Sequence, residues 1–318
     1  MSEPSSTPSP TPSLTPSLTS LEITAQPGCW RRAAEAAANA SGLPAPGERV
    51  AVTGCGTSWF MAQAYAALRE ASGQGETDAF PASEFPVSRT YDRLVVITRS
   101  GTTTEVLDLI GEVRERWEVL ALTADPATPV VRAADDVAVL DWADERSVVQ
   151  TRFATTALAF LRASLERTGR LPEGVKRVAE AAADAETAVI EPLPRAVHSA
   201  GQWTFLGAGW AYGLAQEAAL KMREAAGAWT EAYPAMEYRH GPVAITGPGR
   251  VAWILGDAPA GLEADISRTG GTLVSDGARL DPMADLIRAQ RLAVAVAESR
   301  GLDPDVPKGL TRSVILEG

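Results

Sequence analysis

Five hydroxyl side chains and one glycine lie together in the segment Thr98–Glu105. The apolar run Arg93–Ile97 before it predicts a buried strand, and Val106–Ile110 after it predicts a helix. At such a helix N-terminus free backbone N–H groups and the positive end of the helix dipole converge, and hydroxyls add neutral donors. This chemistry suits a phosphate monoester. The alternative is a polar turn with an ordinary helix cap.

Three ionisable residues share one face of the helix predicted over Leu214–Ala226. Glu217, Lys221 and Glu224 fall at positions i, i+4 and i+7, while the rest of the helix is mainly Ala, Leu and Met. Such a stripe is either a site for proton transfer or a solvated, salt-bridged face.

One of the two histidines stands in a constrained turn. His240 precedes Gly241-Pro242, and an imidazole can take or give a proton near neutral pH. By itself, this position is also typical of an ordinary loop residue.

The elements around these residues alternate between strand and helix, a pattern that predicts an α/β fold with parallel sheets covered on both faces. We expect strands at residues 49–53, 94–97, 119–122, 136–140 and 204–206, and helices at 29–40, 59–69, about 149–167, 172–188 and 214–226.

Two glycine turns indicate an internal duplication. Setting Gly54–Gly56 on Gly207–Gly209, an offset of 153, also places Ala62-Gln63 on Ala215-Gln216 without a gap. In such turns glycine lets the backbone approach a ligand or lets a helix pack on a strand. As a dinucleotide motif the turn is weak, because the third glycine is missing.

Composition excludes several classes of function. A formal charge of −11 argues against nucleic acid as a partner, because such binding needs a basic face. Two cysteines and two histidines provide no disulfide framework and no multi-histidine metal site. No apolar run is long enough to span a membrane. Residues 1–20 are rich in Ser, Thr and Pro, which predicts a disordered tail and not a signal peptide. We expect a cytoplasmic protein without a metal or a cofactor.

The chain resembles the double SIS (sugar isomerase) domain family, and in particular the isomerase half of glucosamine-6-phosphate synthase. The matching stretches follow the family's order over nearly the whole chain outside the tail: Glu22-Ile23 with Gln26-Pro27, Gly54–Ser58, Ser100-Gly101 with Thr103, Glu145 with Ser147-Val148 and Thr151, Ala219–Lys221 with Glu224, Glu231–Tyr233, and His240–Pro242.

The resemblance implies a role for each matched position. Glu224 would be the base that moves a proton between C1 and C2 of a sugar phosphate. His240 would assist ring opening from the neighbouring subunit, which implies a homodimer. Lys221 and Glu217 would flank the sugar and set the charge around Glu224. The phosphate would be held by Ser58, Thr98, Ser100 and Thr103. Gln150 and Arg152 lie beside matched residues and are candidates for the sugar pocket.

Three departures from the family pattern limit this transfer of roles. We expect no glutaminase domain and hence no synthase activity. Arg99 replaces the family's glutamine in the phosphate loop, where it could contact phosphate or point away. Arg312 replaces the family's imine-forming lysine, and a guanidinium stays protonated and cannot form an imine. Lys308 lies four residues away and is the weaker candidate for that role.

These features predict two SIS-type α/β/α subdomains, at residues 21–185 and 186–318, with a C-terminal tail over the active site. The expected substrate is an amino-sugar 6-phosphate, free or N-acetylated. The expected outcome after C2 proton abstraction is deamination with isomerisation, or dehydration catalysed by a lyase. Two alternatives stay open: a non-catalytic sugar-phosphate sensor, and a deglycase of glycated amine 6-phosphates.

Overall fold

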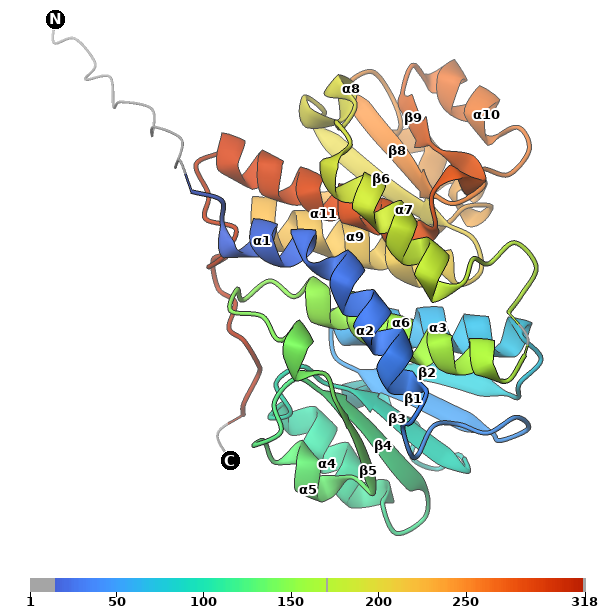
Figure 1. The fold of residues 1–318 in the computed structure, drawn as a ribbon. Helices are drawn as coiled ribbons and strands as arrows, with labels where there is room; N and C mark the ends of the chain where they lie inside the picture. Colours follow the sequence, from blue (N-terminus) through green and yellow to red (C-terminus); the bar gives the residue numbers. More distant parts are fainter. Residues whose placement is uncertain (1–14, 170, 317–318) are drawn as a thin grey trace, which may run out of the picture.

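The computed structural model describes residues 15–169 and 171–316, which form two parallel β-sheets separated by a layer of helices (Figure 1). The first sheet has the strand order β2-β1-β3-β4-β5 and the second the order β7-β6-β8-β9. The strands are β1 (Val50–Gly54), β2 (Thr77–Pro81), β3 (Arg93–Ile97), β4 (Glu118–Thr123), β5 (Asp136–Val139), β6 (Gln202–Gly207), β7 (Thr230–Pro234), β8 (Arg250–Leu255) and β9 (Thr272–Ser275).

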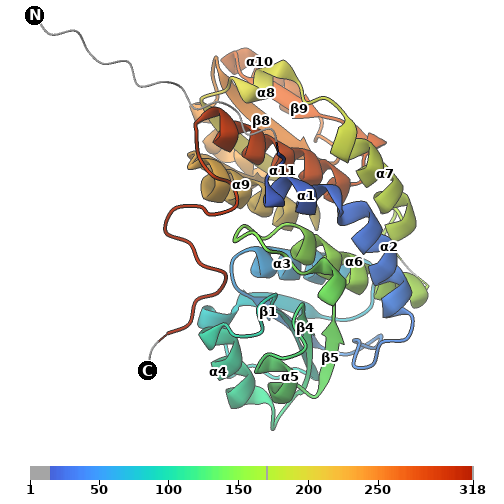
Figure 2. The same ribbon diagram turned by 60° about the vertical axis from the view of Figure 1, so that its left-hand side comes forward.

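Helices cover both faces of each sheet. They are α1 (Leu18–Thr24), α2 (Gln26–Ala37), α3 (Thr57–Ala71), α4 (Thr104–Val113), α5 (Val130–Ala133), α6 (Arg152–Arg167), α7 (Val178–Ile190), α8 (Arg195–His198), α9 (Ala211–Ala226), α10 (Leu262–Thr269) and α11 (Pro282–Ser299). In Figures 1 and 2, α2, α3, α6, α7, α9 and α11 lie between the sheets, whereas α4, α5 and α10 lie on the outer faces.

The apolar pattern of each element explains this layering. The central strands β1 and β6 are almost wholly buried, as expected for parallel strands covered on both faces. The main core fills the helical layer between the sheets. Two smaller cores lie on the outer faces, under α4 and α5 and under α10. α4 is amphipathic and buries Val106, Leu109, Ile110 and Val113.

The two halves repeat one another in register, which confirms the predicted duplicated α/β architecture. Val50 pairs with Thr77 between β1 and β2, and Trp203 pairs with Thr230 between β6 and β7, so both positions are offset by 153. On the other side, Val50 of β1 pairs with Arg93 of β3, and Trp203 of β6 pairs with Val251 of β8. The partners Arg93 and Val251 are offset by 158. The unit strand–glycine turn–helix–strand is therefore built twice.

Several predicted boundaries need correction. Leu18–Ser20 belong to α1, so the last part of the predicted tail is helical; residues 1–14 lie outside the described residues. Thr19 anchors this helix, because its backbone N–H and hydroxyl both donate to Asp305, at 2.8 and 2.7 Å. The predicted subdomain boundary at 185/186 falls within α7, a continuous helix.

Strands β2, β7, β8 and β9 were not predicted. β8 was missed although it is an almost wholly buried apolar run, and β9 is a short edge strand. The edge strands β2 and β7 have a physical reason for being missed. Both are only partly buried and carry charged residues such as Asp78 and Glu231, so neither reads as an apolar run. None of the helices within residues 15–169 and 171–316 combines the length and the apolar character that crossing a membrane requires.

Candidate active site

A pocket opens at the carboxyl edge of the first sheet, between the ends of β1 and β3. The strand order reverses at this point, and α/β sheets bind ligands in such crevices. The pocket brings together residues from four separate segments of the chain: Cys55–Ser58, Ile97–Ser100 with Thr103, Glu105 and Val106, Val148 with Gln150, and Thr311–Val314, and Glu224 comes from α9.

Hydroxyl side chains line the floor of this pocket. Ser58 is in the first turn of α3, and Thr103 precedes the first residue of α4. Ser100 Oγ lies 3.5 Å from Thr103 Oγ1 and accepts a 3.3 Å hydrogen bond from the Thr102 backbone N–H. Two helix N-termini and their hydroxyls therefore converge on one space, an arrangement that suits an anion such as a phosphate monoester.

Glycines are needed at two of these turns. A Cβ on Gly54 would lie 2.6 Å from Ser58 Cβ and 2.9 Å from the Ile97 carbonyl oxygen, so any larger residue would displace the floor of hydroxyl side chains. Gly101 has φ +62°, and its added Cβ would lie 2.1 Å from Thr128 Oγ1. The sequence places glycine where the backbone must turn left-handed or pack closely.

Glu224 forms part of the pocket wall and is linked to a buried ionic group. The Lys221 ammonium donates a short hydrogen bond to Glu224 and lies 3.4 Å from Glu217 Oε1. It also donates a 3.1 Å hydrogen bond to Thr57 Oγ1, at the start of α3. The predicted stripe on α9 is therefore not a solvated face, because Lys221 and Glu217 are completely buried.

Burial shifts the pKa values of Glu217 and Lys221. Removal from water raises the pKa of Glu217 to about 8, although Lys221 acts in the opposite direction. Burial alone would lower the pKa of Lys221, but Glu217 and Glu224 outweigh it and raise that pKa. Lys221 thus stays positively charged beside Glu224, and burial shifts Glu217 towards its protonated form.

Arg99 lines the pocket, and its side chain is bonded to other parts of the protein. Its two terminal nitrogens donate to the carbonyl oxygens of Ser147, Val148 and Arg312 at 3.1–3.3 Å, and Nη1 lies 3.6 Å from Glu145 Oε2. The sequence left open whether Arg99 contacts phosphate or points away, and it did not predict this set of bonds within the protein. Arg99 joins the phosphate loop to the C-terminal segment.

The matched residues around Glu145 shape the loop that carries Val148 and Gln150. Glu145 accepts from the backbone N–H groups of Thr151 and Arg152 at 2.6 and 2.7 Å, so it caps α6. Glu22 in α1 accepts from the Arg146 backbone N–H at 2.6 Å. These carboxylates hold the loop in place and do not line the pocket.

The C-terminal segment returns from α11 to the first sheet and runs past the pocket (Figure 1). Thr102 Oγ1 lies 3.0 Å from Ser313 Oγ, and the Thr104 backbone N–H donates to the Val314 carbonyl at 3.3 Å. The Arg312 side chain bonds to Glu145 and Asp144.

Some predicted site residues do not meet at this pocket within one chain. His240 is exposed in the short 3₁₀ helix η3 (Glu237–His240), after β7, and does not line the pocket. Among the other candidates, Gln150 lines it and Arg152 does not; Lys308 is exposed elsewhere. Thr57 was missed, although it stands next to Ser58 in the same glycine turn.

The chain has the duplicated α/β architecture of the SIS type. No family model matches the chain. A search of curated proteins finds glutamine–fructose-6-phosphate aminotransferases, which confirms the resemblance to their isomerase half. The relative from Nostoc is 26% identical over 85% of this chain and 52% of its own length. The relative from Aeropyrum pernix is 30% identical over 70% of this chain and 43% of its own length. The chain spans about half the length of the curated relatives it matches.

Solved structures give the same architecture over complete chains. Glucosamine-6-phosphate deaminase from Thermotoga maritima superimposes with a TM-score of 0.80, at 25% identity, over 94% of this chain and 100% of that chain. The C-terminal domain of glucosamine-fructose-6-phosphate aminotransferase from Francisella tularensis has a TM-score of 0.77 at 20% identity, covering 92% of this chain and 99% of that domain. The second of these likenesses concerns the fold alone.

Proposed function

We propose that this chain is an enzyme that deaminates and isomerises an amino-sugar 6-phosphate of the glucosamine 6-phosphate class. The observation that carries the proposal is the position of Glu224, a carboxylate in the wall of a pocket whose floor is made of hydroxyls and helix N-termini. The resemblance to a glucosamine-6-phosphate deaminase over complete chains supports the choice of substrate.

The proposed reaction uses groups on both sides of the pocket. Ser58, Ser100 and Thr103 hold the phosphate, which leaves the sugar carbons directed towards α9. Glu224 takes the proton from C2 of the open-chain aldose, because the neighbouring carbonyl makes that C–H acidic. Returning the proton to C1 forms an imine at C2. Water adds to the imine and ammonia leaves, so the products are fructose 6-phosphate and ammonia.

Lys221 has a supporting role in this proposal. A buried ammonium in contact with Glu224 fixes the position of that carboxylate in the pocket wall. Ring opening is assigned to His240 of a neighbouring subunit in a homodimer, since His240 does not reach the pocket of its own chain.

The decisive experiment is a mass spectrum of the products from glucosamine 6-phosphate and, separately, from N-acetylglucosamine 6-phosphate. We expect fructose 6-phosphate and ammonia from the free amine. Loss of water from the acetylated sugar would instead establish a dehydratase. If neither compound changes, the sensor and deglycase alternatives replace this proposal.

A Glu224→Gln variant separates an enzyme from a sensor. We expect it to bind the sugar phosphate as the parent chain does and to lose turnover, since the amide cannot accept the C2 proton. In deuterium oxide, the parent chain should incorporate deuterium into substrate or product, and the variant should not.

A further inference from the structure

A second pocket opens at the carboxyl edge of the second sheet, between the ends of β6 and β8. It occupies in the second half the position that the candidate active site occupies in the first, at the point where the strand order reverses. Trp210 and Ala211, at the start of α9, line it, whereas Glu224 near the end of α9 lines the first pocket. At 1.5 Å per residue the two pockets are about 20 Å apart along this helix.

The second pocket lacks counterparts of all the hydroxyl side chains that are proposed to hold the phosphate in the first pocket. By the offset of 153, Ser58 corresponds to Ala211; by the offset of 158, Thr98, Ser100 and Thr103 correspond to Gly256, Ala258 and Gly261. The same offset sets Asp257 against Arg99. A negative charge now stands at the strand end, which disfavours a phosphate ligand.

The proton-transfer group is also missing from this half. The positions on α3 that correspond to Glu217, Lys221 and Glu224 are Ala64, Leu68 and Ala71. These small and apolar residues of α3 supply neither the carboxylate base nor the ammonium that α9 brings to the first pocket. If this pocket takes a ligand, it binds that ligand without the chemistry proposed for the first site.

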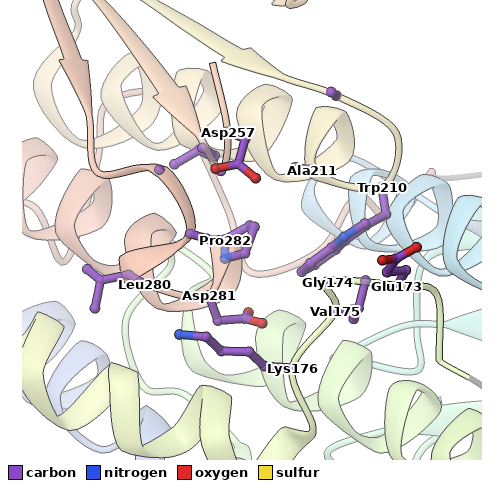
Figure 3. A pocket seen from close by; sticks show the side chains of 15 residues that line it. Glu173, Gly174, Val175, Lys176, Trp210, Ala211, Asp257, Leu280, Asp281 and Pro282 are labelled. Carbon is purple, nitrogen blue, oxygen red and sulfur yellow. The ribbon is translucent and has the colours of Figure 1, made fainter. Parts of the chain in front are cut away.

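The side chains that are present favour a different ligand. Figure 3 shows the Trp210 indole projecting into the pocket, with Asp257 and Pro282 on one side and Glu173 on the other. Asp257 and Glu173 are exposed, and within the described part of the chain they form no ion pair or hydrogen bond. Lys176 is engaged by Asp184, with 2.6 Å between the charged atoms.

The carboxylate of Asp281 also lines the pocket, and it is already bonded within the protein. Arg162 pairs with Asp281, with Nη1 and Nη2 at 3.0 and 2.8 Å from its two carboxylate oxygens. The same guanidinium lies 5.1 Å from the centre of the Trp210 ring. This cation–π contact and the packing of Trp210 on the main core fix the indole as a rigid platform.

We propose that this second pocket binds an unphosphorylated sugar, with the ring stacked on Trp210 and its hydroxyl or amino groups donating to Asp257 and Glu173. Aromatic faces bind the apolar C–H face of a sugar ring, and free carboxylates accept from its polar groups. Rejection of phosphate follows from the same two carboxylates and from the missing hydroxyls.

Calorimetric titration of the whole chain tests this site, with glucosamine and glucose as probes. Both should bind, and Trp210→Ala should weaken binding at least tenfold, with Trp210→Phe in between. Asp257→Asn should weaken glucosamine more than glucose if the amine is recognised, and both equally if only hydroxyls are. Thermal unfolding of each variant checks that it is folded.

Ser100→Ala is the matched control, because it alters the phosphate floor and leaves the second pocket intact. It should bind both probes as the parent chain does, whatever its effect on sugar phosphates, so the two proposals fail separately. The inference is overturned if neither sugar binds, if Trp210→Ala binds them unchanged, or if Ser100→Ala abolishes their binding.

Discussion

The side-chain amide of Gln216 donates a 2.7 Å hydrogen bond to Gln63 Oε1, and the two glutamines are equivalent residues of the duplicated halves. A residue that bonds to its own counterpart lies on the axis relating the halves. α3 and α9 cross there in opposite directions, since Lys221 near the end of α9 meets Thr57 at the start of α3. Gly213 permits the close approach, because a Cβ there would lie 2.4 Å from the Phe60 carbonyl oxygen.

Replacing Lys221 by methionine should strongly reduce turnover and leave the fold intact. The ammonium that holds Glu224 would be lost, and general acid–base groups contribute roughly 10²- to 10⁴-fold to rates. Steady-state kinetics should therefore show a fall in kcat of that order with a small change in KM. Lys308→Met is the matched control and should be active, whereas inactivity would identify Lys308 as an imine-forming residue.

Stability should fall as the pH rises because of Glu217. Its pKa is raised from 4.5 to about 8 in the folded chain, so the folded state holds more protons than the unfolded state between these values. The contribution of Glu217 to the free energy of unfolding is complete below pH 4.5. It is lost as the pH rises through 8, at no more than about 1.4 kcal/mol per pH unit. Denaturant unfolding measured across this range would detect it.

Glu217→Gln should flatten that pH dependence, since an amide of the same shape does not ionise. Glu263→Gln, on the exposed side of α10, should leave the dependence unchanged. An equal slope in the parent chain and Glu217→Gln would show that Glu217 is already ionised in the folded protein.

Replacing Arg99 by alanine should release the C-terminal segment from the phosphate loop. The carbonyl of Arg312 would lose its donor, and the contact of Thr104 with Val314 would weaken. Hydrogen exchange should speed up at residues 311–316, and KM for the sugar phosphate should rise. Arg99→Lys should not restore either property, because one ammonium cannot reach three carbonyls. Unchanged hydrogen exchange at residues 311–316 would show that Arg99 does not hold the C-terminal segment in place.

Gly101→Ala should destabilise the chain by about 1–3 kcal/mol, because alanine is strained at φ +62° and its Cβ would collide with Thr128. Sugar-phosphate affinity should fall with it. Gly111→Ala is the control within α4: its Cβ meets nothing within 4 Å, and helix propensity favours it by about 1 kcal/mol. Thermal unfolding would measure both, and a stable Gly101→Ala would contradict the assigned turn.

The sequence predicts the central strands of the first sheet and the turn at Thr98–Thr103 well, for physical reasons, but it misses the central strand β8 of the second sheet. Strands β1, β3 and β4 are buried on both faces and read as apolar runs, and the hydroxyls of Thr98–Thr103 follow directly from one of them. The stripe on α9 is visible because its helical spacing is local. Whether that stripe is buried depends on α3, which lies more than 140 residues earlier.

The C-terminal contacts could not be predicted in this way. Residues 311–316 have no regular structure, and their bonds to Thr102 and Thr104 join positions more than 200 residues apart. The direction of Arg99 depends on the carbonyls of a distant loop. The second pocket could not be predicted either. It is recognised only when the residues at the ends of β6 and β8 are compared with the hydroxyl-bearing residues at the corresponding positions of the first half.

The opposed course of α3 and α9 has a consequence for how the molecule can be divided. The residues proposed to grip the phosphate come before position 150, and the proposed base is at position 224, so each half of the duplication holds only part of the reaction centre. Two fragments severed between the sheets should each be inert, and mixing them should restore activity by complementation. The proposed reaction therefore depends on the junction of the two repeats and on neither repeat alone.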